Sequence, residues 1–177
     1  MTSDAVPAGG LPDAERLYER LLGDLRRELP PGAAMIGIAT GGAWLAERLH
    51  RDLGIEEPLG VLDISFYRDD FDHKGLHHHV KPSKIPFEVE GRPIVLVDDV
   101  LFTGRTVRAA MNELFDYGRP AKIELAVLAD RGGRELPISA RFVGAKVDVP
   151  TGKRLLLERG EGEKLNLRFA DERQSGR

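Results

Sequence analysis

The first apolar pattern along the chain is a helical one close to its start. Asp13 is a residue type that caps helices, and Pro30-Pro31-Gly32 is a sequence that ends them. Between these signals, leucines recur every four residues, a spacing that places them on one face of a helix. We therefore expect a helix from Asp13 to about Leu29, with a buried stripe formed by Leu17, Leu21, Leu25 and Leu29.

After this helix, short apolar runs alternate with segments of helical periodicity. The runs expected as strands are residues 34–39, 59–66, 93–97 and 123–128. The segments expected as helices are residues 43–53 and 106–117, each followed by a glycine that can end it. Such alternation predicts an α/β fold with a parallel sheet, helices on its faces and right-handed crossovers. Shorter strand-like runs follow at residues 142–149, 154–157 and 165–169.

Three segments fall outside this pattern. Residues 1–12 are small and polar and are expected as a disordered leader, and residues 171–177 are expected as a polar tail. The polar stretch 67–86 is long for a connection, so we expect a functional lid or a disordered loop there. The remaining chain, residues 13–170, has the size of a single domain.

Composition excludes several classes of function. The 177 residues contain no cysteine, which excludes disulfides, thiolate metal sites and thiol nucleophiles. No apolar run approaches the roughly 20 residues that span a bilayer, so we expect a cytoplasmic protein without a membrane partner. With 26 basic and 29 acidic residues the net charge is −3, which argues against a surface built wholly for nucleic acid. Three consecutive histidines, 77–79, do not predict a metal site, because adjacent side chains on an extended chain point different ways.

The most specific chemistry lies in residues 95–106, VLVDDVLFTGRT. An apolar strand there ends in Asp98 and Asp99, and a Thr-Gly-Arg-Thr turn then opens a helix. Open parallel sheets bind ligands at the carboxyl ends of their strands. The backbone N–H groups, hydroxyls and helix dipole of the turn suit a phosphate, and Gly104 permits a close backbone approach. The two carboxylates suit sugar hydroxyls or a magnesium shell, so a ribose phosphate satisfies both halves.

Each half of this segment has a simpler explanation when taken alone. An Asp-Asp pair at a strand end also occurs in phospho-acceptor domains, and a TGxT sequence can be an ordinary helix cap. In this order and context, however, the two halves together are specific for a phosphosugar.

Two further segments suit a pyrophosphate. Thr40-Gly41-Gly42 follows the first strand, and its glycines permit backbone donors to face the ligand. Arg68, in the sequence SFYRDD, is a natural partner for pyrophosphate charge, although a solvated charge cluster is the alternative. Residues 130–134, DRGGR, follow a strand and can frame a base with backbone groups, and a charged surface turn explains them equally well.

With these motifs in view, the chain resembles the PyrR family of type I phosphoribosyltransferases, bifunctional pyrimidine operon regulators with uracil phosphoribosyltransferase activity. The resemblance runs from about residue 13 to residue 169 and is strongest in four segments. They are LDISFYRDD (62–70), VKPSKIPFEVEGR (80–92), VLVDDVLFTGRTVRAAMNEL (95–114) and GRPAKIELAVLADRGGRELPI (118–138). Related purine enzymes share the phosphate motif without the YRDD and DRGxRELPI sequences.

The resemblance implies a central parallel sheet flanked by helices, with a small hood and a long flexible loop. It implies transfer of uracil onto 5-phosphoribosyl-1-pyrophosphate (PRPP), giving UMP and pyrophosphate, in a homodimer or homotetramer. Mg²⁺ is implied to arrive with PRPP near Asp98 and Asp99, which are implied as catalytic together with Arg68. Arg131 and Val149 are implied to contact the base. The implied PRPP-binding residues are Thr40, Gly41, Gly42, Asp98, Asp99, Val100, Leu101, Phe102, Thr103, Gly104, Arg105 and Thr106.

The chain departs from the family pattern at two positions. Gly41 stands where members commonly have an arginine in the pyrophosphate loop, and Gly133 stands where RNA-binding members often have a histidine. Any UMP-responsive binding of pyrimidine operon leader RNA therefore needs a local basic face, for which the candidates are Arg16, Arg20, Arg27 and Arg134. Two alternatives stay open: an RNA-binding regulator that uses the fold mainly as a nucleotide sensor, and a transferase for another base.

Overall fold

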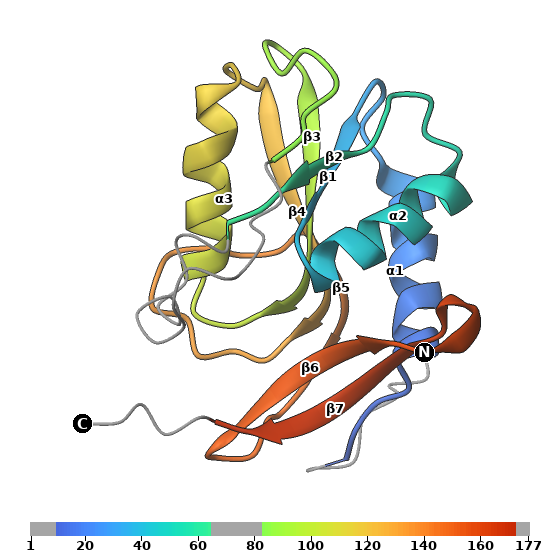
Figure 1. Cartoon of the computed structure of the whole chain (residues 1–177), viewed down its shortest axis with the longest axis vertical. Helices are drawn as coiled ribbons and strands as arrows, with labels where there is room; N and C mark the ends of the chain where they lie inside the picture. Colours follow the sequence, from blue (N-terminus) through green and yellow to red (C-terminus); the bar gives the residue numbers. More distant parts are fainter. Residues whose placement is uncertain (1–9, 65–82, 173–177) are drawn as a thin grey trace.

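The computed structural model describes residues 10–64 and 83–172. Its centre is a five-stranded sheet with the order β2-β1-β3-β4-β5, in which every neighbouring pair is parallel (Figure 1). The predicted parallel sheet is therefore confirmed. The strands are β1 (Ala34–Ile38), β2 (Gly60–Leu62), β3 (Pro93–Leu101), β4 (Lys122–Asp130) and β5 (Phe142–Lys146). Arg68, and most of the expected leader, lid and tail, lie outside the described residues.

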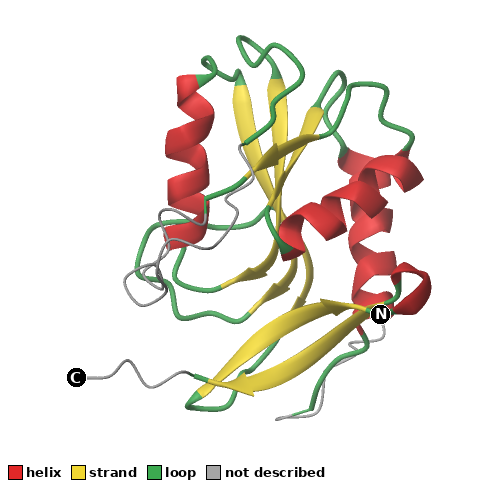
Figure 2. Ribbon diagram, in the orientation of Figure 1, coloured by secondary structure: helices red, strands yellow, loops and turns green. Residues whose placement is uncertain are grey.

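Helices cover both faces of this sheet, as predicted (Figures 1 and 2). α1 (Ala14–Glu28) and α2 (Gly41–Leu53) pack on one face, and α3 (Arg105–Asp116) packs on the other. Within β1, Met35 belongs to the apolar cluster of α1 and α2, whereas Ile36 belongs to the cluster of α3. A strand buried on both faces needs apolar side chains at successive positions, which explains the uninterrupted apolar run in the sequence.

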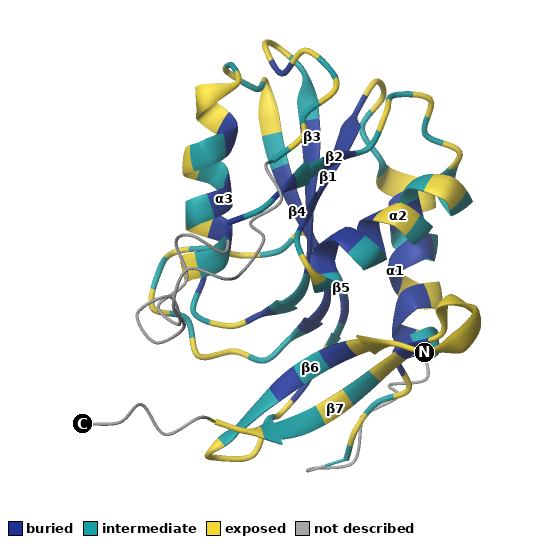
Figure 3. Cartoon of the chain, viewed as in Figure 1, coloured by how far each residue is buried: buried dark blue, intermediate teal, exposed yellow. Residues whose placement is uncertain are grey.

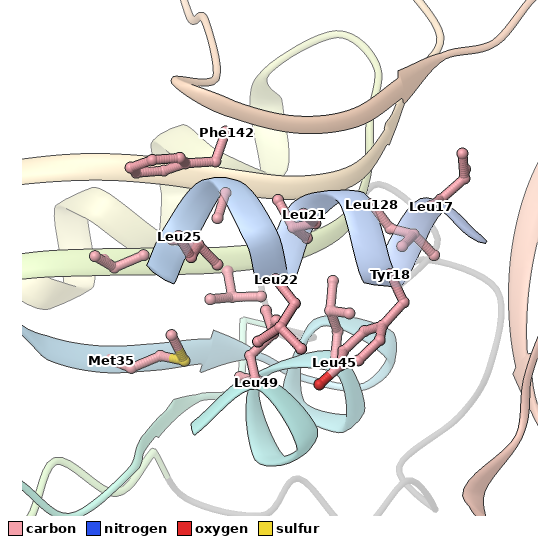
Figure 4. Packing of buried hydrophobic residues seen from close by; sticks show 14 of the residues in the cluster. Leu17, Tyr18, Leu21, Leu22, Leu25, Met35, Leu45, Leu49, Leu128 and Phe142 are labelled. Carbon is pink, nitrogen blue, oxygen red and sulfur yellow. The ribbon is translucent and has the colours of Figure 1, made fainter. Parts of the chain in front are cut away.

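α1 forms where its leucine pattern predicts it. Asp13 caps the helix by accepting the backbone N–H of Glu15 at 2.8 Å. Full burial of a leucine contributes about 1.5–3 kcal/mol, so the buried stripe holds α1 against the sheet more strongly than its own helix propensity does. Figure 4 shows this stripe and its neighbours: Leu17, Tyr18, Leu21, Leu22 and Leu25 lie against Leu45, Leu49, Leu128 and Phe142.

The C-terminal residues form an antiparallel hairpin of β6 (Lys153–Arg159) and β7 (Leu165–Asp171), joined through the short helix η3 (Glu161–Glu163). The hairpin lies beyond the carboxyl ends of the sheet strands (Figure 1). Leu155 of the hairpin joins Ala129 of β4 in a small apolar cluster there. This hairpin, residues 153–171, is called the hood below, and it matches the hood implied by the resemblance.

Three predicted strand ends differ from the observed ends by three or more residues. β3 continues beyond residue 97 through Asp98 and Asp99, because its ladder with β4 extends to the pair of Leu101 and Asp130. Of the run predicted at 59–66, the described part forms a strand only over Gly60–Leu62. The run predicted at 142–149 leaves the sheet after residue 146, where its pairing with β4 ends.

Burial changes abruptly along β3, as the colours of Figure 3 show. Residues 94–98 are buried, whereas Asp99 and Val100 are partly exposed. The carboxylates therefore lie at the point where the strand emerges from the core. Each helix within residues 10–64 and 83–172 is too short or too polar to cross a membrane.

Candidate active site

The direction of the chain across the sheet reverses between β1 and β3. From β1 the chain passes through α2 to the edge strand β2, and it returns to β3 on the other side of β1. The helices that follow β1 and β3 lie on opposite faces of the sheet. The two loops that lead into them therefore meet at the carboxyl edge, which is where open α/β sheets bind their ligands.

At this edge the structure brings Asp98 and Asp99 against the glycines that follow β1. A Cβ added to Gly42 would lie 2.6 Å from the carbonyl oxygen of Val97 and 2.9 Å from the Cα of Asp98. A Cβ added to Gly41 would lie 2.8 Å from the Cγ of Asp99. Two segments that the sequence offered separately, the Asp-Asp pair and the Thr-Gly-Gly loop, thus form one site.

Backbone hydrogen bonds orient both carboxylates. Asp98, only 3% exposed, accepts the N–H of Asp99 on Oδ1 at 2.9 Å, and Asp99 accepts the N–H of Val100 on Oδ1 at 2.9 Å. A carboxylate has about four lone-pair sites, so the hydrogen bond from Val100 does not use up the capacity of the partly exposed Asp99 to accept sugar hydroxyls. In the facing loop, the peptide bond between Ala39 and Thr40 is cis.

The turn between β3 and α3, residues 102–104, has the form expected for a phosphate site and is called the phosphate turn below. Thr103 accepts the backbone N–H of Arg105 on its hydroxyl at 3.2 Å, and Gly104 has a φ of 92°. α3 then begins at Arg105 after Gly104, which has no side chain of its own to cap the helix, so the helix terminus and its dipole face this loop. Thr106, half-buried, lies in that first turn.

The side chain of Arg105 has a different position from the one its PRPP assignment suggests. Its Nε donates to the carboxylate of Glu135 at 2.7 Å, on the loop that follows β4. The backbone of Arg105 still lies at the helix start. Its assignment to PRPP therefore rests on its place in the first turn of α3, since its guanidinium is bonded to Glu135 and its N–H to the hydroxyl of Thr103.

The loop after β4 closes over the phosphate turn. Arg131, with its side chain 11% exposed, lies with its guanidinium 3.8 Å from the ring centre of Phe102. Burial lowers the pKa of Arg131, and its Nη2 donates to the backbone oxygen of Lys153 at the start of the hood. Arg131 thus links the phosphate turn to the hood, which is where the resemblance places the base.

Of the other predicted residues, Val149 lies near the site and three of the four arginines predicted to bind RNA lie on α1. Val149 packs against the apolar cluster of Ala129, Val147 and Leu155 at the base of the hood, so its side chain offers an apolar contact there. Arg16, Arg20 and Arg27 are exposed on α1. Arg134, assigned to the same RNA surface, is instead engaged within the loop after β4.

Sequence reasoning missed a polar network that joins α1, α2 and the hood. Arg48 of α2 donates both Nη groups to Glu15 of α1, at 2.8 and 2.7 Å. Glu15 also accepts the backbone N–H of Leu165 of the hood at 2.8 Å, and the Arg48 guanidinium lies 3.9 Å from the Tyr18 ring. The hydrogen bond from Arg48 holds the pKa of Glu15 below its usual value, against the opposing effect of burial. Partners up to 150 positions apart leave no local pattern, so the sequence carried no signal for them.

The carboxylates of Asp98 and Asp99 fit a magnesium ion that takes its remaining ligands from water and substrate phosphates. Within residues 10–64 and 83–172, no three histidine or carboxylate side chains converge into a metal cluster. Mg²⁺ usually keeps several waters and binds through one or two carboxylates together with substrate phosphates. Asp98 and Asp99, adjacent to a loop suited to pyrophosphate, are such a pair.

Comparisons with known proteins agree with this geometry. The phosphoribosyl transferase domain family matches residues 9–151. The chain is 51% identical to the bifunctional protein PyrR of Ralstonia nicotianae over 166 residues, covering 92% of this chain and 94% of that protein. It is 52% identical to the bifunctional protein PyrR of Pseudomonas aeruginosa over 151 residues, covering 83% and 89% respectively.

Solved structures agree in fold. The purine phosphoribosyltransferase of Pyrococcus horikoshii superimposes with a TM-score of 0.57 at 28% identity, covering 76% of this chain and 82% of its own. A hypoxanthine phosphoribosyltransferase of Staphylococcus aureus superimposes with a TM-score of 0.59 at 20% identity, covering 84% of both chains. These neighbours confirm the type I phosphoribosyltransferase fold. The chain therefore belongs to the phosphoribosyl transferase domain family and, within it, to the PyrR family.

Proposed function

We propose that this protein is a uracil phosphoribosyltransferase, which forms UMP and pyrophosphate from uracil and PRPP. The observation that supports this most directly is the contact between the Asp98-Asp99 pair and the Gly41-Gly42 loop, with the phosphate turn beside them. PRPP carries a 5′-phosphate, two ribose hydroxyls and a pyrophosphate, and each of these has a matching element at this edge. We propose residues 13–170 as the working domain, acting in the cytoplasm as a homodimer or homotetramer.

The reaction joins N1 of uracil to C1 of the ribose as the bond from C1 to the pyrophosphate oxygen breaks, and the N1 proton is released. Asp98 and Asp99 accept the ribose hydroxyls and fix the sugar, while the turn around Thr103 and Gly104 holds the 5′-phosphate. N–H groups of the Thr40 loop, together with Arg68, meet the charge that grows on the leaving group. When bound with PRPP, Mg²⁺ neutralises part of that charge.

Uracil is proposed to lie between the phosphate turn, Arg131 and the base of the hood near Val149. The chain needs no side-chain nucleophile for this chemistry, which agrees with the absence of cysteine. Its contribution is positioning and electrostatic stabilisation, and these depend on rigid loops.

RNA binding is a second candidate function. The observation that favours it is the row of exposed arginines on α1, together with the name "bifunctional" that the relatives carry. Pyrimidine operon leader RNA is the proposed partner and UMP the proposed effector.

The test of the enzyme proposal is pyrophosphate release from PRPP and Mg²⁺ with a panel of bases. Uracil should be the preferred substrate, with cytosine, orotate, hypoxanthine and guanine far slower. Preference for a purine or for orotate would assign the site to another base. No release with any base, but UMP-dependent binding of leader RNA, would leave the regulator alone.

A further inference from the structure

Phe102, the first residue after β3, is held from several sides by the loop that follows β4. The Arg131 guanidinium lies 3.8 Å from its ring centre, and the ring also covers Gly133. A Cβ added to Gly133 would lie 2.5 Å from the ring atom Cε2. One ring is thus packed between a guanidinium and a glycine backbone, although the residue as a whole remains 40% exposed.

The backbone of Phe102 is held by Arg134 of the same loop. Nη1 of Arg134 donates to the carbonyl oxygen of Phe102 at 2.8 Å, and Nε donates to the carbonyl oxygen of Ile138 at 2.8 Å. Nη2 donates to Asp130 at 2.6 Å, and Nη1 also reaches the carbonyl oxygen of Gly132 at 3.4 Å. The planar fork of an arginine can satisfy several acceptors in one arrangement, whereas a lysine ammonium at the end of a flexible stem cannot reproduce that geometry.

The next residue of the phosphate turn is held by the same loop. The carbonyl oxygen of Thr103 accepts the backbone N–H groups of Glu135 and Leu136, at 3.0 and 3.1 Å. Consecutive carbonyls of the turn therefore face the loop after β4. This fixes the turn at the point where the α3 terminus begins, and a helix N-terminus is suited to an anion.

We propose that Phe102 and Arg134 are positioning residues, which fix the phosphate turn in its binding conformation before PRPP arrives. This rests on the proposed function, and it gives both residues roles that differ from those the sequence suggested. Phe102 acts through its ring, which anchors the turn. Arg134 acts through the hydrogen bonds that hold the backbone of Phe102 to the loop. Since Arg131 joins Phe102 to the hood, the anchor also couples the phosphate side of the site to the base side.

The test compares four variants for PRPP affinity and thermal stability. Phe102→Tyr keeps the flat ring and should retain the wild-type KM for PRPP within about twofold. Phe102→Leu keeps apolar bulk without the ring face, and Arg134→Lys keeps charge without the fork. Each should raise the KM for PRPP by about tenfold, which corresponds to about 1.4 kcal/mol, with a smaller change in kcat. Phe115→Ala is the matched control, since Phe115 is a comparably exposed phenylalanine, 51% exposed, at the opposite end of α3 from the turn that precedes Arg105.

A role in overall folding alone would lower the melting temperature and leave the KM for PRPP unchanged. Wild-type KM values for both Phe102→Leu and Arg134→Lys would overturn the proposal, as would equal losses in Phe102→Tyr and Phe102→Leu. Calorimetric binding of PRPP in Mg²⁺ is measured on the same proteins. If the wild type releases no pyrophosphate with any base, the proposed function fails, and the calorimetric Kd values still decide whether the turn is anchored in this way.

Discussion

Replacement of Gly41 by alanine should impair catalysis because it displaces the carboxylate of Asp99. A Cβ at position 41 would lie 2.8 Å from Cγ and 3.2 Å from Cβ of Asp99, whereas carbon atoms prefer separations of about 3.5–4.0 Å. The Asp99 side chain would have to rotate away, since the backbone of Gly41 is fixed by the start of α2. That rotation breaks the 2.9 Å hydrogen bond from the N–H of Val100.

The expected magnitude follows from these two costs. An off-rotamer side chain costs about 0.5–1.5 kcal/mol. Loss of a hydrogen bond costs about a further 0.5–1.5 kcal/mol. A total of about 1–3 kcal/mol, applied to the group proposed to hold the ribose, is expected to lower kcat/KM by about 5- to 150-fold. Gly41→Arg introduces the same Cβ, so we expect a loss there as well, even though it restores the charge that family members commonly have at this position.

The assay is UMP formation at saturating Mg²⁺, with kcat and KM for PRPP measured beside the melting temperature. Gly23→Ala is the matched control, because Gly23 lies within α1 and an added Cβ would meet only Nη1 of Arg27, at 3.9 Å. It should keep full activity and stabilise the helix by about 0.5–1 kcal/mol. If Gly41→Ala retains kcat/KM within about twofold of wild type, the position of the Asp99 carboxylate does not limit the reaction.

Four further outcomes are expected. UMP formation should require a divalent cation, because paired carboxylates face a polyanionic substrate, and equal rates in excess EDTA would contradict this. Asp99→Ala and Thr106→Ala should each lower kcat/KM by about 10- to 100-fold while the melting temperature falls by less than about 4 °C; wild-type turnover would place the phosphosugar elsewhere. Because the hydrogen bond from Arg48 lowers the pKa of Glu15, the stability it contributes is present at neutral pH and lost as the pH falls into the carboxylate range. Glu15→Gln should therefore flatten the dependence of melting temperature on pH below about 5, and an unchanged profile would refute this. Leader RNA should bind weakly, and UMP should strengthen this binding. The slope of log K against log salt concentration should be about −0.7 for each phosphate contact, and salt-insensitive binding would contradict a basic face.

The order and type of the elements could be predicted because burial imposes a period on the sequence. The leucines of α1 recur every fourth residue and are all buried up to Leu25, and the apolar run of β1 is buried at every position. The end of β3 could not be predicted in this way. Aspartate disfavours a strand, and Asp98 and Asp99 remain in β3 because its ladder with the neighbouring strand β4 continues past them.

The site was predictable as a set of motifs but not as an arrangement. The Asp-Asp pair and the Thr-Gly-Gly loop each have a local chemical meaning, and the parallel sheet brings them to one edge. The contacts of Phe102 with Arg131 and Arg134 join residues about 30 positions apart along the chain, and no spacing or period marks them. For the same reason the arginine at 134 was assigned from its charge alone.

The contacts of Arg134 change the argument about RNA. An arginine has five N–H donors, and Arg134 already makes four hydrogen bonds, to oxygens of Phe102, Gly132, Ile138 and Asp130. An RNA phosphate would have to compete with the loop that holds the phosphate turn. The basic face proposed for RNA therefore reduces to α1, where Arg27 is also paired with Asp24.

This placement constrains how UMP could affect RNA binding. The exposed arginines of α1 lie on the opposite side of that helix from its buried stripe, so we expect a nucleotide at the proposed site to affect them indirectly. α2 touches both regions: its first residue, Gly41, adjoins Asp99, and its Arg48 holds Glu15 of α1. The hood also reaches Glu15, through the N–H of Leu165. Coupling between two sites requires an element whose state both sites bias. If RNA binding depends on UMP, Glu15→Gln should reduce that dependence while leaving the affinity for UMP itself nearly unchanged.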